Sequence, residues 1–157
     1  MEAIAVIAQQ PHDQRDSAEL HSRLRSFFWE LIATWDLLHA WANIRYQLGL
    51  TGRDLTPHGV RDKMSGREDC ASALTILQNA AKTDWFCEVK TYRNYAHRSY
   101  ADVQTLLTEA TGESHIFLVP AREGQGYVPV VEQLKTYIDE MYAVGMQIQA
   151  VKTGEAV

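Results

Sequence analysis

Residues 20–44, LHSRLRSFFWELIATWDLLHAWANI, decide the fold that the sequence predicts for this chain. Apolar side chains recur there at intervals of three and four residues, which is the period of one face of an α-helix. A first series consists of Leu20, Leu24, Phe27, Leu31, Leu38 and Ala42, and a flanking series of Phe28, Ile32, Trp35, Trp41 and Ile44. Because so wide a stripe must be covered on more than one side, we predict a long central helix with Trp35 and Leu38 largely buried.

Four later stretches show the same helical period, and together they predict an all-α fold. They cover residues 57–65, where Thr56–Pro57 is typical of a helix start, and residues 68–96, 100–110 and 131–148, with a kink or break near Lys82 in the second. In the last stretch Gly145 lies on the apolar seam, which predicts the close approach of a neighbouring helix. The expected architecture is a bundle of four or five helices.

The helical period is interrupted at HIFLVPAREGQGYVPV, residues 115–130. Two short apolar runs there, Ile116–Val119 and Tyr127–Val130, flank a connection that contains glycine, which predicts a small β-hairpin or extended insertion near 116–130. Otherwise we expect residues 1–157 to form a single helical domain. Within it, residues 1–15 are expected to form a loose or partly docked arm, and residues 152–157 a frayed tail.

Charge and cysteine content narrow the class of protein. The formal net charge of -5 argues against a surface that is basic throughout, as in many nucleic-acid-binding proteins, but allows a local basic patch. No apolar segment is long enough to span a membrane. Cys70 and Cys87 match no metal motif and are expected to be buried thiols. We therefore expect a cytoplasmic protein with no cofactor and no bound metal.

A second stretch, TYRNYAHRSY from Thr91 to Tyr100, carries the residues most suited to chemistry. Arg93 and His97 are four apart, so on a helix they lie on one face, with Asn94 beside them. Tyr92 belongs to the apolar seam of the same helix. The polar residues therefore lie at the border of the core, where a ligand or a second subunit could cover them.

The string YRNYAH on a late helix of a small bundle resembles the signature of the HEPN superfamily. That resemblance implies a four- or five-helix bundle, dimerisation through the face that carries the motif, and metal-independent ribonuclease activity in active members. Arg93 would neutralise the scissile phosphate, His97 would transfer the proton, and Asn94 would order the site. Such proteins act on RNA or nucleotides, and a bacterial defence or toxin–antitoxin setting would follow.

The motif departs from the family pattern at one point. Three residues separate Arg93 from His97, one fewer than in the family. One residue rotates a helical side chain by about 100°, so the resemblance predicts weak or absent ribonuclease activity. Whether the chain is an enzyme therefore stays open. The structural alternative is a pair on the helix surface near Glu88 or Asp102, which would add a few tenths of a kcal/mol to stability.

Two further sets of residues have the composition of a ligand site. Trp35, Trp41 and Trp85 could line an apolar ligand pocket, which supports an alternative function: a non-enzymatic bundle that binds a protein partner or a small apolar ligand. Asp36 and His39 have the spacing of a di-iron ligand pair. That motif needs matching acids on other helices, and the sequence shows no second such motif.

Overall fold

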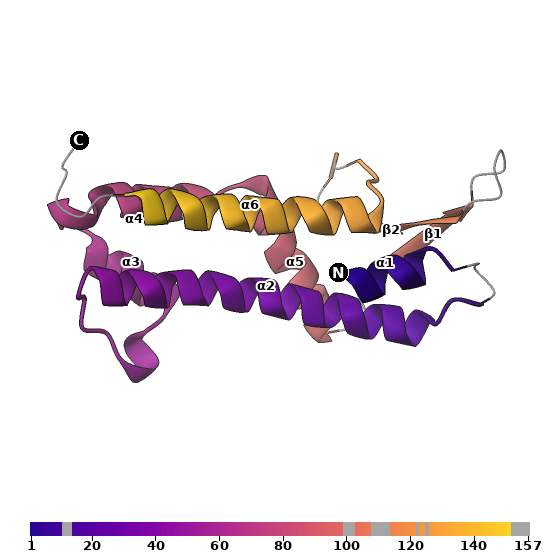
Figure 1. The fold of residues 1–157 in the computed structure, drawn as a ribbon, viewed down its shortest axis with the longest axis horizontal. Coiled ribbons are helices and arrows are strands. Elements are labelled where there is room, and N and C mark those ends of the chain that lie inside the picture. The colour runs from indigo at the N-terminus through magenta and orange to yellow at the C-terminus, as the bar shows by residue number, and fades with distance from the viewer. Residues whose placement is uncertain (11–13, 99–102, 108–113, 122, 125, 152–157) are drawn as a thin grey trace. The chain divides into compact units, whose positions relative to one another are not determined.

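The computed structural model describes residues 1–10, 14–98, 103–107, 114–121, 123–124 and 126–151. Over these residues the chain is an all-α helical bundle, as the sequence predicts (Figure 1). The α-helices are α1 (Glu2–Ala8), α2 (Ser17–Arg45), α3 (Pro57–Met64), α4 (Ala71–Ala80), α5 (Asp84–Arg98) and α6 (Val130–Ala150). Short 3-10 helices lie at Gly52–Asp54 and Glu68–Cys70, and the strands are β1 (Val103–Leu107) and β2 (Ser114–Leu118).

The chain divides into two compact units. The first unit contains residues 1–30 and 88–138, and the second contains residues 31–87 and 139–157. Each boundary falls inside one of the helices α2, α5 and α6, so these helices contribute a segment to both units. The division therefore does not follow a flexible linker.

The first unit packs α1, the start of α2, most of α5 and the start of α6. Helix α2 begins where the Asp16 carboxylate accepts a hydrogen bond from the backbone N–H of Glu19 at 3.0 Å, which satisfies one free donor of the first turn. Ile4 and Ile7 of α1 are buried, so this part of the predicted N-terminal arm is docked. The rest of the core is formed by Leu20, Leu24, Phe27, Phe28, Val89, Tyr92, Ala96, Ile116, Leu118, Val130, Leu134 and Tyr137.

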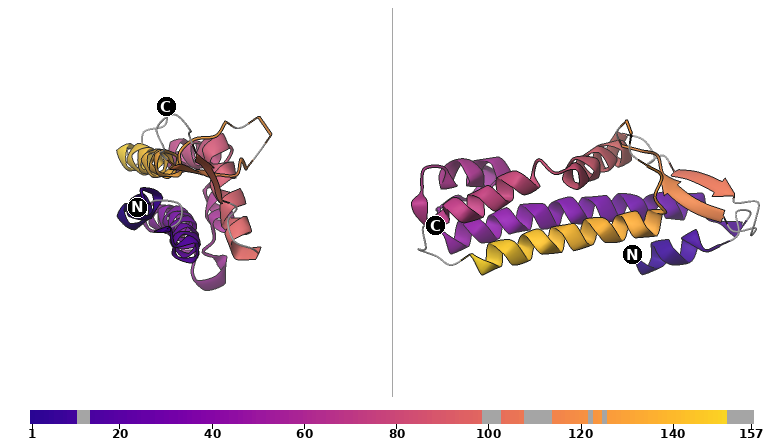
Figure 2. Two further views of the ribbon diagram at one scale, coloured as in Figure 1. Left: turned by 90° about the vertical axis from the view of Figure 1, so that its right-hand side faces the viewer. Right: turned by 90° about the horizontal axis from the view of Figure 1, so that it is seen from above.

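The second unit packs the remainder of α2 and α6 with α3 and α4. Thr56 is the N-cap of α3, since its hydroxyl accepts a hydrogen bond from the N–H of Gly59 at 3.0 Å. Trp35 is buried as predicted, whereas Leu38 is only half-buried. A Cβ on Gly145 would lie 3.6 Å from Leu38 Cδ2, so α2 and α6 are neighbours here (Figure 2). The predicted close approach is therefore real, but it leaves room for a methyl group.

The extended insertion pairs differently from the prediction. Strands β1 and β2 are antiparallel, with Val103 opposite Leu118 and Leu107 opposite Ser114. The helix predicted over 100–110 is therefore wrong at 103–107, while residues 99–102 and 108–113 lie outside the described residues. Val103 and Leu107 are four apart and fit either structure, and so short an apolar run does not distinguish helix from strand. The second predicted strand contributes a single bridge, between Phe117 and Pro129.

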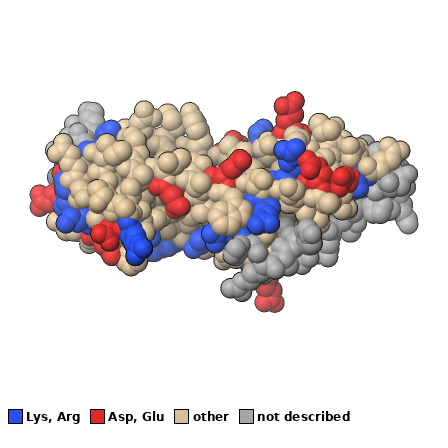
Figure 3. Space-filling view, turned by 90° about the horizontal axis from the view of Figure 1, so that it is seen from below, with Lys and Arg blue, Asp and Glu red and all other residues tan. Residues whose placement is uncertain are grey.

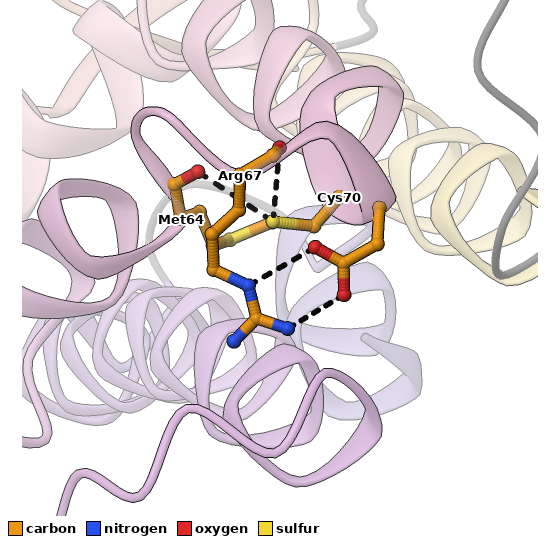
Figure 4. Close-up of polar contacts among 4 residues, drawn as sticks. Met64, Arg67 and Cys70 are labelled. Atoms are coloured by element: carbon orange, nitrogen blue, oxygen red, sulfur yellow. Dashed lines mark hydrogen bonds and ion pairs between the residues drawn. The ribbon is translucent and has the colours of Figure 1, made fainter.

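The two cysteines lie in different environments. Cys70 is buried, and its thiol donates to the carbonyl oxygens of Met64 at 3.5 Å and Arg67 at 3.7 Å (Figure 4). Burial, with help from the Asp69 charge, raises the pKa of the Cys70 thiol, which keeps it protonated and unreactive. Cys87 is exposed, so the prediction of a second buried thiol is wrong. Within the described residues, none of the helices is long and apolar enough to cross a membrane.

Candidate functional site

Helix α5 positions the motif residues through its buried seam. Val89, Tyr92 and Ala96 are buried at intervals of three and four residues. Successive side chains on a helix are rotated by about 100°, so Arg93 lies just outside this seam and Asn94 further round. Arg93 is half-buried and Asn94 is exposed, as this geometry requires. Arg93 and Asn94 thus lie at the border of the core, as the sequence predicts.

Tyr92 fixes the position of the residue that follows it. Its hydroxyl donates to the Val119 carbonyl oxygen at 2.8 Å, and its ring stacks on Phe28 with the centroids 5.3 Å apart. These contacts tie α5 to α2 and to the chain just after β2 within the first unit. Because the backbone at Tyr92 is held from two sides, the adjacent Arg93 side chain starts from a fixed position.

The Arg93 guanidinium lies over an aromatic ring that the sequence analysis did not pair with it. Its central carbon is 4.4 Å from the centroid of the Trp29 ring, and Nη1 donates to Asn94 Oδ1 at 3.2 Å. A cation at this distance from a tryptophan is held by roughly 0.5–1 kcal/mol or more. Among the described residues, Nε of Arg93 is buried with no hydrogen-bond partner. The guanidinium is therefore held in place while most of its five N–H donors stay uncommitted to the described residues.

Trp29 is itself partly open to solvent, at 39 % exposed. Arg25 lies one helical turn before it on the same side of α2, and Lys90 lies one turn before Arg93 on α5; both are exposed. We call Trp29, Arg93, Asn94, Arg25 and Lys90 the arginine–tryptophan surface. In the sequence this surface is indicated by Trp29, which falls outside the apolar series of α2 and follows Arg25 at helical spacing.

His97 is placed by the structure only through its backbone. It lies on α5 one turn after Arg93, and its side chain lies outside the described residues. Glu88, proposed above as a surface partner of the motif, is instead buried, and the other proposed partner, Asp102, is not among the described residues. The proton-transfer role of His97 therefore stays a prediction.

A buried polar network lies behind the motif helix, and the sequence analysis missed it. The Tyr137 hydroxyl donates to Glu88 Oε2 at 2.8 Å and accepts from Gln133 Nε2 at 2.6 Å. Burial, followed by the hydrogen bond and charge of Glu88, raises the pKa of Tyr137, so this phenol stays protonated. The network joins α5 to α6 inside the first unit and supports the position of the seam. In the sequence this network is indicated by the four-residue spacing of Gln133 and Tyr137, which puts two polar groups on one face of α6.

The tryptophans proposed for an apolar pocket lie in the second unit, and only two of them are joined. Trp35 is buried against Phe86, with the ring centroids 4.3 Å apart, and Trp85 contacts the same Phe86 edge-on at 5.4 Å. Trp41 is in contact with Arg45, whose guanidinium carbon lies 5.0 Å from its ring centroid. The three rings therefore belong to two aromatic groups.

His39 is buried next to Trp35, and both of its ring nitrogens are engaged. Nδ1 donates to the Trp35 carbonyl oxygen at 2.9 Å, so Nε2 is the acceptor for Arg61 Nη1 at 3.0 Å. Burial, together with the charge of Arg61, lowers the pKa of His39 to about 4, although the hydrogen bond to the Trp35 carbonyl opposes this shift. The Asp36–His39 spacing thus forms no ligand pair. Within the described part of the chain, no three His, Cys, Asp or Glu side chains are grouped to hold a metal ion.

No protein-family model matches this chain, and no curated protein and no solved structure matches it. What the chain can do must therefore be argued from its own residues.

Proposed function

We propose that this chain is an HEPN-like helical domain that binds single-stranded RNA or a nucleotide at the arginine–tryptophan surface. The observation that supports this most strongly is the Arg93 guanidinium held 4.4 Å over the partly exposed Trp29 ring. Single-stranded nucleic acids are bound by surfaces that combine basic groups for the backbone with aromatic rings for the bases. An exposed aromatic ring framed by Arg25, Lys90 and Arg93 has both elements.

Each residue would have a defined part in binding. Arginine presents a planar fork that can bind a phosphate with two hydrogen bonds, and the Trp29 ring and Asn94 restrict how far Arg93 can turn. Lys90 and Arg25 would contact neighbouring phosphates as simple charges. The Trp29 ring offers an apolar face on which a base can stack. The overall charge of -5 makes a local contact of this kind more favourable than a broad footprint.

The surface charge agrees with a local site. On the face drawn in Figure 3, basic and acidic side chains are interspersed, and neither sign covers a large continuous area. We therefore expect few phosphate contacts. With about three phosphate contacts to a single strand, the logarithm of the binding constant should fall linearly with the logarithm of the salt concentration, with a slope of about −2.

Catalysis would need His97 as the proton-transfer group. An attack by the ribose 2′-hydroxyl needs position and charge stabilisation rather than a metal, and Arg93 could supply the charge. Because His97 follows Arg93 one residue earlier than in the family pattern, we expect binding with weak or absent cleavage. Any cleavage should survive a metal chelator and leave a 2′,3′-cyclic phosphate.

The proposal is tested by fluorescence anisotropy with a labelled single-stranded RNA oligonucleotide. Arg93→Ala should weaken binding by about tenfold, since it removes a phosphate contact, and Trp29→Ala should do the same through lost stacking. The matched control is Arg23→Ala, because Arg23 is an exposed arginine of α2 paired with Glu19 at 2.6 Å. Equal effects of Arg93→Ala and Arg23→Ala, or no binding by the natural chain, would overturn the proposal.

A further inference from the structure

The second unit contains a surface with no formal charge. Residues 37–44 of α2 and 141–150 of α6 include no Asp, Glu, Lys or Arg, and the one histidine, His39, is buried. Four large apolar side chains in these segments are exposed, although others, such as Met141 and Ile148, are buried. The four exposed side chains are Leu37 at 67 %, Ile44 at 75 %, Tyr142 at 67 % and Met146 at 47 %.

These side chains form one face across two neighbouring helices. The approach of Leu38 to Gly145, described above, places α2 beside α6 in this unit (Figure 2). On α2, Leu37, Trp41 and Ile44 follow one another at four and three residues, so they lie in a row. On α6, Tyr142 and Met146 are one turn apart. We call Leu37, Trp41, Ile44, Tyr142 and Met146 the uncharged face.

The nearest cation on α2, Arg45, contacts this face at Trp41. Arg45 lies with its guanidinium carbon 5.0 Å from the Trp41 ring centroid and donates to the Val151 carbonyl oxygen at 2.5 Å. That hydrogen bond ties the end of α2 to the end of α6. The guanidinium is thus engaged by the chain's own groups, and Trp41 is the member of the face that it contacts.

The size of the face suggests an interface. Four large side chains that are about half or more exposed offer an apolar area on the order of 500 Å², which is near the upper end for the largest patch on a monomer. Two such faces together would bury on the order of 1,000 Å², which is close to the lower limit for a specific interface. An association of moderate strength would follow.

The charge distribution favours a second copy of this chain over a partner that binds through opposite charge. A partner that recognises this chain by opposite charge finds no charged side chain in residues 37–44 and 141–150. Two copies of a chain with net charge -5 repel each other, and they approach at least cost through a face without charge. We propose that the uncharged face is the interface with a second copy of this chain. In a two-fold interface the same face serves both partners, and rows at four and three residues suit helix-to-helix packing.

The interface differs from the one that the family resemblance implies. It uses α2 and α6 of the second unit, whereas that resemblance would place the dimer contact on the α5 motif. Association should therefore be unchanged by Arg93→Ala. Arg93→Ala therefore tests RNA binding without disturbing the dimer interface, so either proposal can fail while the other holds.

Sedimentation velocity over a range of protein concentrations tests the proposal on the full chain. The natural chain should show a monomer–dimer equilibrium, and Leu37→Glu and Tyr142→Glu should each weaken it at least about tenfold by burying a charge. Val6→Glu is the matched control, because Val6 is an apolar side chain of the first unit with a similar exposure of 56 %; it should leave the equilibrium unchanged.

A mixing experiment separates a true interface from damage to the fold. Leu37→Glu and Leu37→Lys, each weak alone, should associate more strongly with each other, since the mixed pair carries opposite charges in one interface. A natural chain that stays monomeric at the highest concentration would overturn the proposal. Dimerisation that Leu37→Glu and Tyr142→Glu leave unaffected would overturn it as well.

Discussion

Two tryptophans of α2, one in each unit, lie near an arginine from another helix, and the two arrangements differ in what they can do. In the second unit, Trp35 is buried against His39, and His39 accepts a hydrogen bond from Arg61. In the first unit, Trp29 is partly exposed, and Arg93 lies over its ring. The first arrangement uses its polar groups for the chain's own packing, whereas the second leaves several Arg93 donors without a hydrogen-bond partner among the described residues. Burial of the tryptophan thus separates a structural arginine from a candidate binding arginine.

The largest expected effect is on stability, and it compares the two tryptophans directly. Trp35→Ala should lower the free energy of unfolding by about 3–5 kcal/mol, because it removes a buried aromatic side chain. Trp29→Ala should lower it by only about 1 kcal/mol, chiefly through the lost contact with Arg93. Urea unfolding followed by circular dichroism measures both. Similar losses for the two substitutions would mean that the two regions do not differ as described.

The next effect is a dependence of stability on pH that originates in the second unit. His39 has a pKa of about 4 when folded against 6.5 for the ordinary group, so the unfolded chain binds the additional proton first. Stability from this residue is therefore complete above pH 6.5 and is lost as the pH falls toward 4. The loss should reach at most about 3 kcal/mol.

This pH dependence is measured as the unfolding free energy at several pH values between 4 and 7. In His39→Gln the same slope should be clearly smaller, whatever the stability of the variant at neutral pH. A slope that is the same in His39→Gln and the natural chain would show that His39 is not held neutral.

The smallest expected effect concerns the packing of α2 against α6. Gly145→Ala should stabilise the chain by about 0.5–1 kcal/mol, since alanine favours a helix and its methyl group would meet Leu38 Cδ2 at an ordinary 3.6 Å. The melting temperature should rise slightly. A clear fall would mean that the helices are closer at this point than the structure has them.

The sequence predicted the helical framework well because the evidence for it repeats over many residues. Helix α2 carries apolar groups at helical spacing over six turns, and α3 has a recognisable start at Thr56–Pro57. Strand β1 was mistaken for a helix because five residues do not separate a period of two from one of 3.6. Leu38 was expected to be more buried than it is, since a wide apolar stripe does not reveal which of its edges remains uncovered. Cys87 was expected to be buried as a small apolar group, and residue type alone does not decide burial.

Only part of the candidate site could be predicted from the sequence. Arg93 and Asn94 could be recognised from the motif and placed at the border of the core. Their contact with Trp29 could not, because it joins α2 and α5 across more than sixty residues of chain, and a single sequence gives no pairing between helices. The same reason hid the Glu88–Tyr137 hydrogen bond and the Arg61–His39 pair. Contacts between distant elements depend on the fold as a whole.

The central claim, that the arginine–tryptophan surface binds RNA, is tested most directly by the indole N–H signals in an NMR spectrum. The chain has four tryptophans, and single Trp→Phe substitutions assign their signals. On addition of a single-stranded RNA oligonucleotide, we predict that the Trp29 signal shifts while those of Trp35, Trp41 and Trp85 stay nearly unchanged, and that Arg93→Ala greatly reduces the shift. A shift confined to Trp35 or Trp85, with Trp29 unmoved, would contradict the account.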